Sequence, residues 1–418
     1  MILLMSGGLT ITAGAVIFLL ITLILVSALL FAKAKLLPSG NIKMVVNEEK
    51  EFEVAMGGTL LGTLQSQGIF LSSACGGSGS CGQCRCQVPE GGGNILPTET
   101  GFFSRKQMQA YWRLGCQTKV KENMKVVVPE EVFGVNEWEC TVVSNRNVAS
   151  FIKEFTVRLP EGEKMDFKPG SYSQIKIPKY DLKFTEFDID ERFRSEWDKF
   201  KMWSLACKNE EETIRAYSMA NYPAEGNIIT LNVRIATPPF DRAAGGWKAV
   251  KPGIGSTFIF NLKPGDKVKM SGPYGDFHIL DTKREMLYIG GGAGMAPLRA
   301  HLLHLFKTLK TTDRTISYWY GARSKNEIFY EEDFRAIEKE FPNFKFNIAL
   351  SEPRPEDNWT GYVGFIHQVI LNHYLIDHEA PEDIEFYMCG PGPMAKAVEG
   401  MLDSLGVPRE MLHFDDFG

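Results

Sequence analysis

Residues Cys75 to Cys86 read CGGSGSCGQCRC and place three thiols, at Cys75, Cys81 and Cys84, in one glycine-rich loop. A further thiol, Cys116, stands in LGCQTK, with 31 residues between it and Cys84. Structural zinc usually takes its thiols from two Cys-x-x-Cys pairs of similar form, whereas here three thiols share a loop and the fourth comes from a distant segment. This asymmetric spacing is typical of a 2Fe–2S cluster. The motif therefore predicts four iron ligands, with a zinc site or a purely structural loop as the alternatives.

The loop is rich in glycine. Without side chains in the way, its backbone N–H groups can surround the anionic sulfides of a cluster. Five residues separate Cys75 from Cys81, which resembles adrenodoxin-like and bacterial ferredoxins. This resemblance implies a β-grasp 2Fe–2S ferredoxin domain, expected at residues 36–130. The sequence pattern also predicts a helix with Met108, Tyr111 and Leu114 that leads to Cys116. Cys86 is interpreted as a buried small hydrophobe and not a ligand.

Length and composition limit the number of domains and the classes of protein to which the chain can belong. A chain of 418 residues indicates about three domains. A net charge of −5 and the lack of a lysine-rich stripe argue against nucleic acid as a partner. Eight cysteines are too few for a secreted scaffold held by disulfides.

Residues 9–31, LTITAGAVIFLLITLILVSALLF, contain no charge. As a helix they would be roughly 35 Å long, which is enough to cross a bilayer. The alternative is a cleaved signal peptide, which needs a basic start that MILLMSGG lacks. We therefore expect residues 1–35 to be a single transmembrane anchor. Lys33 and Lys35 follow the apolar run and favour a cytoplasmic location for everything downstream. Because the cytoplasm is reducing, the clustered thiols are expected to bind metal and not to form disulfides.

From residue 131 to 280, short strand-like runs separated by Gly and Pro predict a small antiparallel β-barrel. Residues 179–214 interrupt this pattern with charges of both signs and interleaved aromatic residues. We interpret this insertion as a solvated excursion with a surface helix, and a docking surface for a partner protein is the alternative.

Within the barrel, RAYSMA (215–220) carries the R-x-Y-S pattern of the ferredoxin–NADP⁺ reductase superfamily, which the chain resembles here. The resemblance implies bound FAD: Arg215 neutralises its pyrophosphate, Tyr217 lies on the flavin ring and Ser218 hydrogen-bonds N5. PGIGST resembles the G-x-x-S phosphate turn of the same superfamily, with Gly253 and Ser256 as the binding residues. An ordinary glycine-rich turn is the alternative for that second stretch.

Residues 281–418 alternate strand and helix, which predicts an α/β domain with a parallel sheet. GGGAGMAP forms a glycine turn before a helix, where free N–H groups at Gly292 and Gly294 and the helix dipole favour a pyrophosphate. Pro297 stands where the dinucleotide fingerprint has its third glycine, as in the reductase superfamily. Cys389 and Gly390 begin the C-G-P of that superfamily, in which the thiol approaches the nicotinamide; a buried cysteine at a strand end is the alternative.

The chain ends in FDDFG. The resemblance implies that Phe417 stacks on the flavin and moves aside for the nicotinamide, so that Ser218, Cys389 and Phe417 all take part in hydride transfer. A loose hydrophobic tail is the alternative for Phe417. The choice between NADH and NADPH stays open at this stage, because Arg323 and Ser324 in YGARS offer groups for a 2′-phosphate.

An anchor, a ferredoxin, a flavin barrel and a nicotinamide domain, in this order and with this insertion, resemble the F subunits of the sodium-pumping NADH:quinone oxidoreductases. The resemblance implies that NADH reduces FAD, that one 2Fe–2S cluster accepts single electrons, and that other membrane subunits pass them to ubiquinone or menaquinone. It also implies a single-pass protein of the bacterial inner membrane with its catalytic domains in the cytoplasm. Sodium would cross elsewhere, because the apolar run 9–31 of the anchor has no ionisable residue.

Three other interpretations fit parts of the sequence. The first is a membrane-anchored NAD(P)H-dependent reductase component of an oxygenase. The second is an electron carrier that is not itself an enzyme, and the third is a structural adaptor that binds zinc.

Overall fold

The computed structural model describes residues 2–36, 40–241, 243 and 245–415. The chain divides into two compact units: Met1–Leu71 with Cys84–Pro129, and Ser72–Gln83 with Glu130–Gly418. The loop that carries Cys75 and Cys81 therefore belongs to the second unit, whereas Cys84 and Cys116 belong to the first.

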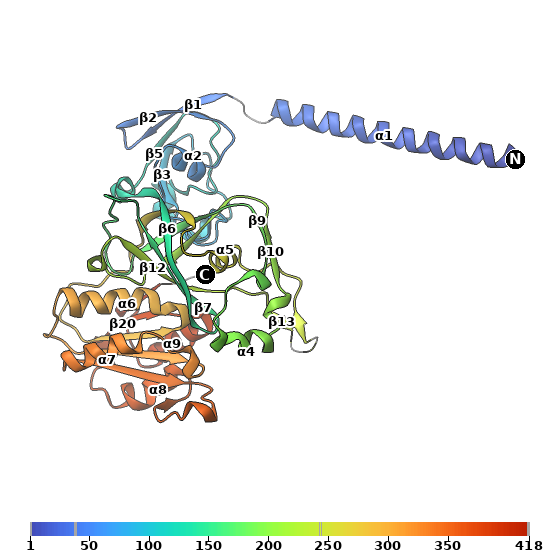
Figure 1. Cartoon of the computed structure of the whole chain (residues 1–418). Helices are drawn as coiled ribbons and strands as arrows, with labels where there is room; N and C mark the ends of the chain where they lie inside the picture. Colours follow the sequence, from blue (N-terminus) through green and yellow to red (C-terminus); the bar gives the residue numbers. More distant parts are fainter. Residues whose placement is uncertain (1, 37–39, 242, 244, 416–418) are drawn as a thin grey trace. The chain divides into compact units, whose positions relative to one another are not determined.

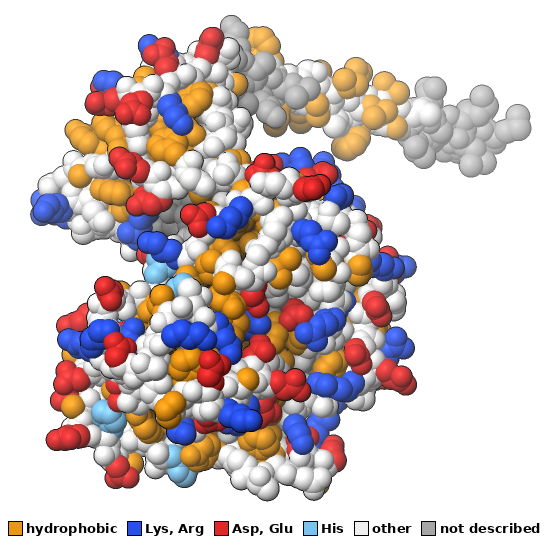
Figure 2. Space-filling model, turned by 60° about the vertical axis from the view of Figure 1, so that its left-hand side comes forward, with side chains coloured by type: hydrophobic (Ala, Val, Ile, Leu, Met, Phe, Trp, Pro, Cys, Tyr) orange, Lys and Arg blue, Asp and Glu red, His pale blue; other side chains and the backbone are white. Residues whose placement is uncertain are grey.

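The first element is α1 (Ile2–Leu36), one uninterrupted helix (Figure 1). Its segment Thr12–Leu29 has a mean hydropathy of 2.6 and none of it is buried. By length and composition α1 is long and apolar enough to cross a membrane, and it is the one such helix in the part of the chain that the structure describes. In Figure 2 its described side chains are predominantly hydrophobic, whereas acidic and basic side chains are interspersed over the visible face of the larger unit.

The rest of the first unit is a mixed five-stranded sheet with two short helices. The elements are β1 (Asn41–Val46), β2 (Lys50–Ala55), α2 (Leu60–Ser66), β3 (Arg85–Glu90), α3 (Arg105–Gln109), β4 (Trp112–Leu114) and β5 (Met124–Val127). The strand order is β2-β1-β5-β3-β4, with β1 parallel to β5 and the other pairs antiparallel. The side chain of Thr59 caps α2, which buries Leu60 and Leu64. The predicted β-grasp fold is confirmed.

One local prediction in this unit is wrong. Met108 lies in α3, but the helix ends at Gln109, and Leu114 belongs to strand β4. Tyr111 has a φ of 61°, which is left-handed backbone and stops the helix. The strand that follows carries the chain to Cys116.

The second unit contains an antiparallel sheet of six strands: β6 (Asn136–Ala149), β7 (Ile152–Arg158), β8 (Tyr172–Ile177), β11 (Thr213–Ser218), β12 (Ile228–Arg234) and β15 (Lys267–Tyr274). Their order is β11-β8-β15-β6-β7-β12. An antiparallel bridge between Met219 and Leu231 joins the two outer strands, and the N–H of Ala220 donates to the carbonyl of Thr230 at 2.7 Å. The sheet therefore closes on itself, and the predicted barrel is confirmed. Helix α5 (Ile254–Asn261) contributes Ile259 to its core.

The charged insertion forms the hairpin β9 (Tyr180–Lys183) and β10 (Ala206–Asn209) with helix α4 (Glu191–Lys199) between them. The prediction of a solvated excursion is wrong for one face of this helix, on which Phe193, Glu196 and Trp197 are buried. Phe193 is 2% exposed and Trp197 is fully buried, and both belong to the barrel core. The physical reason is their spacing of four residues, which puts both rings on one face of the helix. The alternative interpretation, a docking surface for a partner, stays a prediction.

The remaining part of the second unit is an entirely parallel sheet of six strands with helices on both faces (Figure 1). The elements are β16 (Met286–Gly291), α6 (Met295–Leu303), β17 (Ile316–Ala322), α7 (Glu331–Glu340), β18 (Phe344–Leu350), β19 (Tyr362–Val363), α8 (Ile366–His373), β20 (Glu385–Cys389), α9 (Gly392–Ser404) and β21 (Leu412–Asp415). Alternate residues of β16 serve different cores. Tyr288 packs with α6 and α7, whereas Leu287 and Ile289 pack with α8 and α9. The predicted α/β domain is confirmed.

Candidate functional site

Strand β11 presents the predicted flavin residues. Arg215 and Tyr217 are two residues apart and so share one face, and Ser218 points to the other. The face with Arg215 and Tyr217 lies against the first turn of α5. A Cβ added to Gly255 would lie 2.5 Å from the Tyr217 hydroxyl and 2.9 Å from Arg215 Cγ. Only glycine at position 255 permits this approach, which brings a cation and an aromatic ring to the positive end of a helix.

The turn that starts α5 is fixed by Ser256. Its hydroxyl donates to the carbonyl of Gly253 at 3.2 Å and accepts from the N–H of Ala236 at 3.0 Å. Ser256 is 5% exposed, so its hydroxyl holds the turn, while the first N–H groups of the helix are free of intrahelical partners. These groups and Arg215 fit a pyrophosphate. Arg215 itself donates through Nη1 to the carbonyl of Ile214 at 2.7 Å.

The glycine turn after β16 meets the end of β20. Gly290 and Cys389 are neighbours in the parallel register of these strands. A Cβ added to Gly294 would lie 2.6 Å from the nitrogen of Gly390 and closer still to the carbonyl of Cys389. Gly292 has a φ of 57°, which few residues other than glycine adopt. The segments GGGAG and CGP thus lie side by side at the carboxyl edge of the parallel sheet.

Helix α6 starts at this edge and is directed by its proline. Pro297 is buried in the first turn of α6, where a missing N–H costs no intrahelical hydrogen bond. Cys389 is 1% exposed and lies at the last position of β20. The turn leaves N–H groups at the amino end of α6, which fit the pyrophosphate of a nicotinamide dinucleotide.

Strand β21 links the flavin strand to this edge. Asp415, its last residue, pairs in parallel register with Cys389. Its carboxylate accepts a hydrogen bond from the Ser218 hydroxyl at 2.5 Å. Asp415 was not among the residues predicted from the sequence, and the signal for it was the acidic pair that precedes the terminal aromatic residue. Phe417, the predicted stacking residue, lies outside the described residues.

The four predicted iron ligands form two pairs, one in each compact unit. In the second unit the Cys81 thiol donates to Cys75 Sγ at 3.3 Å, and this hydrogen bond lowers the pKa of Cys75 to about 2. In the first unit the N–H of Cys116 donates to Cys84 Sγ at 3.5 Å, and both thiols are buried. Among the described residues, no group of three or more His, Cys, Asp or Glu side chains is arranged to hold a metal ion.

The chemistry of the donor set nevertheless fits a cluster. All four candidates are thiols, and thiolates are the ligands that iron–sulfur clusters use. The loop between Cys75 and Cys84 takes left-handed backbone at each of its glycines: Gly76, Gly77, Gly79 and Gly82. Successive N–H groups in such turns form an anion-binding concavity. Cys86 is fully buried in β3, in agreement with the prediction of a buried small residue.

A buried ion pair positions the segment that carries Cys116. Arg113 is 4% exposed and its guanidinium donates to Glu99, which is fully buried, at 2.8 Å. Glu99 also accepts the N–H of Leu114 at 2.8 Å. Nothing in the sequence around either residue indicates this pairing.

The loop Ser72–Gln83 also contacts the barrel within the second unit. The Tyr172 hydroxyl, on β8, donates to Gln83 at 2.8 Å and contacts the Ser72 hydroxyl. A Cβ added to Gly76 would lie 2.5 Å from Arg215 Nη1. The cysteine loop therefore abuts the strand that carries the flavin residues.

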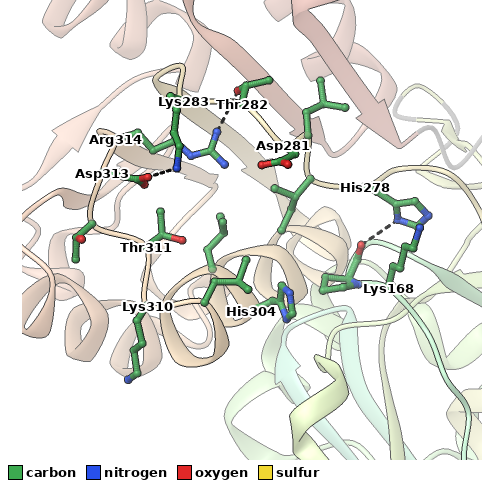
Figure 3. A pocket seen from close by; sticks show the side chains of 16 residues that line it. Lys168, His278, Asp281, Thr282, Lys283, His304, Lys310, Thr311, Asp313 and Arg314 are labelled. Carbon is green, nitrogen blue, oxygen red and sulfur yellow. Dashed lines mark hydrogen bonds and ion pairs between the residues drawn. The ribbon is translucent and has the colours of Figure 1, made fainter.

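A cavity of about 530 Å³ lies elsewhere, at the amino ends of the parallel strands (Figure 3). Its lining includes Lys283, which pairs with Asp313, and Arg314, which donates to Thr282 at 3.2 Å. Gly292 and Cys389 stand at the opposite, carboxyl edge, so this cavity contains none of the predicted nucleotide-binding residues.

Three family models match the chain. They are the 2Fe-2S iron-sulfur cluster binding domain at residues 44–121, the oxidoreductase FAD-binding domain at 191–279 and the oxidoreductase NAD-binding domain at 288–400. Each match includes candidate residues described above.

Several F subunits of Na(+)-translocating NADH-quinone reductases are similar to this chain over nearly its whole length. The F subunit of the Na(+)-translocating NADH-quinone reductase of Pseudomonas aeruginosa strain UCBPP-PA14 is 53% identical over 401 residues, covering 96% of this chain and 97% of the relative. The protein of the same name from Idiomarina loihiensis is 52% identical over 407 residues, covering 97% and 98%. That of Neisseria meningitidis strain FAM18 is 53% identical over 405 residues, again covering 97% and 98%.

Solved structures share the fold at lower identity. An Amycolatopsis cytochrome P450 reductase has a TM-score of 0.62 at 21% identity, covering 90% of this chain and 98% of that one. A ferredoxin reductase in carbazole 1,9a-dioxygenase has a TM-score of 0.57 at 23% identity, covering 91% and 99%.

Proposed function

The chain belongs to the family of F subunits of Na(+)-translocating NADH-quinone reductases. We propose that it passes electrons from NADH toward membrane-bound quinone. The chain is an oxidoreductase with FAD, one 2Fe–2S cluster and NADH as substrate. Electrons enter from NADH through FAD to the cluster. FAD supplies the step from a two-electron donor to a one-electron acceptor, which no side chain of the protein performs.

The flavin residues act by charge and by shape. Arg215 and the amino end of α5 bind the pyrophosphate, and Tyr217 offers its ring as a flat surface to the flavin. Gly253 and Ser256 hold the turn at the start of α5 and so orient its N–H groups. Burial raises the pKa of Tyr217, so the phenol stays neutral beside the cofactor.

The nicotinamide end of the site is assigned to the edge formed by Gly292, Gly294, Cys389 and Gly390, with Pro297 directing α6. The Ser218 Oγ–H donates to Asp415, and this bond fixes the direction of the hydroxyl at the flavin strand. The observation that carries the proposal is the position of Asp415, hydrogen-bonded to Ser218 and in register with Cys389. Phe417 keeps its proposed role of covering the flavin until NADH arrives.

Cys75, Cys81, Cys84 and Cys116 are proposed to hold the cluster. Their thiols supply all four ligands, and the glycine turns between them supply N–H groups to its anionic sulfides. We propose the domain limits 1–35, 36–130, 131–280 and 281–418.

The membrane part follows from α1 and from the relatives' names. We propose that α1 anchors the chain in the inner membrane as a single span, and that Lys33 and Lys35 keep the remainder in the cytoplasm. Other subunits would accept the electrons, reduce the quinone and conduct sodium, because α1 offers no ionisable group within its apolar segment.

The test is a spectrum of the full-length protein purified with its lipids. NADH is expected to bleach flavin absorbance and to produce the EPR signal of a reduced 2Fe–2S cluster. Iron and acid-labile sulfide are expected at two of each per chain. Flavin bleaching without a cluster signal would refute the assigned ligands, and no bleaching would refute the assigned NADH site.

A further inference from the structure

The charged insertion contains one carboxylate that solvent hardly reaches. Glu196 lies in α4 and is 5% exposed, next to the fully buried Trp197. Trp197 donates through its indole N–H to the carbonyl of Ser150 at 2.7 Å, which fixes the helix to the barrel. A carboxylate at such a position is costly to bury unless cations surround it.

Two arginines of the nucleotide-binding part surround Glu196. Arg323 Nη2 lies 2.6 Å from one carboxylate oxygen and Arg354 Nη2 lies 2.5 Å from the other. Arg323 also lies 3.4 Å from Glu327. Burial opposes ionisation of Glu196, but the hydrogen bond and charge of Arg323, together with the charges of Lys199 and Arg354, outweigh it, so the pKa of Glu196 is lowered. The carboxylate is therefore charged at neutral pH.

The position of these arginines in the parallel sheet relates their ion pairs with Glu196 to nucleotide binding. Arg323 directly follows β17, and in register Gly321 of that strand pairs with Gly291 at the start of the nucleotide turn. Arg354 follows β18, the next strand, at the same carboxyl edge. In sheets of this kind the end of the second strand meets the adenosine ribose, where an acidic residue suits the 2′-hydroxyl of NADH and an arginine suits the 2′-phosphate of NADPH.

We infer that Glu196 determines the specificity of the site for NADH by holding the guanidinium groups of Arg323 and Arg354 in ion pairs where a 2′-phosphate would bind. This inference rests on the proposed function of the edge at Gly292 and Cys389. The side chains of Arg323 and Arg354 are 29% and 28% exposed, so a ligand can reach them.

The charges explain the selection. A phosphate monoester carries roughly two negative charges at neutral pH. At Arg323 and Arg354 it would be repelled by the carboxylate of Glu196, which already pairs with both. A neutral hydroxyl meets no such repulsion. Ser324, the other residue that the sequence offered for a 2′-phosphate, is 1% exposed and presents no surface to it.

The experiment compares Glu196→Gln with wild type in the full-length protein that retains FAD. The ratio of kcat/KM for NADPH to that for NADH, with ferricyanide as acceptor, is expected to rise roughly tenfold or more, because a like charge is removed. Inhibition by adenosine 2′,5′-bisphosphate is expected to strengthen relative to inhibition by 5′-AMP. Glu210→Gln is the matched control, since Glu210 is an exposed carboxylate of the same insertion, and it is expected to change neither ratio.

A second variant moves the ratio the other way. Arg354→Gln removes one counter-charge from Glu196 at a partly exposed position, so the NADPH to NADH ratio is expected to fall. Unchanged ratios in flavin-loaded Glu196→Gln, or in Arg354→Gln where Glu196→Gln does not retain flavin, would overturn the inference. If wild type fails to oxidise NADH, the proposed function fails and not merely this inference.

Discussion

Replacing Gly294 by alanine tests the proposed nicotinamide edge with a single methyl group. Gly294 has a φ of −62°, which alanine adopts without strain, so the effect comes from contact alone. The new Cβ would lie 2.6 Å from the nitrogen of Gly390, where ordinary contact begins near 3.4 Å. The turn and the end of β20 must therefore separate by at least about 0.8 Å, and by more at the carbonyl of Cys389.

The expected cost follows from that displacement. Overpacking of this kind destabilises a fold by about 1–3 kcal/mol, which the unit should survive. A shift approaching 1 Å at groups that position a substrate lowers a rate by about 100-fold. We therefore expect kcat/KM for NADH to fall by about two orders of magnitude, while FAD content and the dithionite-reduced cluster signal stay at wild-type levels.

The measurement is NADH oxidation with ferricyanide as acceptor, and Gly400→Ala is the control. Gly400 lies within α9 and an added Cβ there meets nothing within 4 Å. That change should leave kcat/KM unaltered and stabilise the helix by about 0.5–1 kcal/mol. Wild-type kcat/KM in flavin-loaded Gly294→Ala would show that the close approach of the two motifs has no role in binding NADH.

Three further predictions concern other residues. Cys116→Ser is expected to abolish bound iron and acid-labile sulfide while NADH still bleaches the flavin; a wild-type cluster signal would exclude Cys116 as a ligand. Asp415→Asn, which removes the charge that accepts the Ser218 hydrogen bond, is expected to slow flavin reduction in stopped flow by about 10- to 100-fold, and an unchanged rate would separate Asp415 from hydride transfer. Burial lowers the pKa of His301 to about 3 from its ordinary 6.5, so below pH 6.5 the unfolded chain binds a proton that the folded chain does not. The free energy of unfolding should then fall by about 1.4 kcal/mol per pH unit toward pH 3, and His301→Gln should flatten that slope between pH 7 and 5 in thermal unfolding; equal slopes would contradict the assignment.

Much of the fold could be predicted from local pattern. The strand-turn-helix unit around GGGAGMAP could be predicted because its signals are adjacent in the sequence. Gly292 indicates the turn, because the backbone there has a positive φ. The antiparallel barrel follows from the spacing of its strands. Three of the four proposed iron ligands could be predicted because iron–sulfur spacing is a local signal on the loop from Cys75 to Cys84.

What the sequence could not supply were pairings between distant segments. Asp415 meets Ser218 across 197 positions, and Glu99 meets Arg113 only because α3 stops short and β4 turns the chain back. A left-handed residue at Tyr111 ends the helix, although tyrosine rarely takes that conformation and its side chain fits a helical pattern. Local periodicity carries no information on such contacts, since each depends on a partner chosen by the tertiary fold.

The insertion shows how this limit affects function. A dense mixture of charges predicts solvation because most carboxylates are better hydrated than buried. Glu196 departs from that rule, and its partners Arg323 and Arg354 are 127 and 158 positions away. Removing either arginine would leave charge in a poorly solvated place, so the three residues act as one unit. The helix that buries Trp197 in the barrel therefore also delivers a negative charge to the nucleotide edge, which connects the flavin barrel to the choice of electron donor.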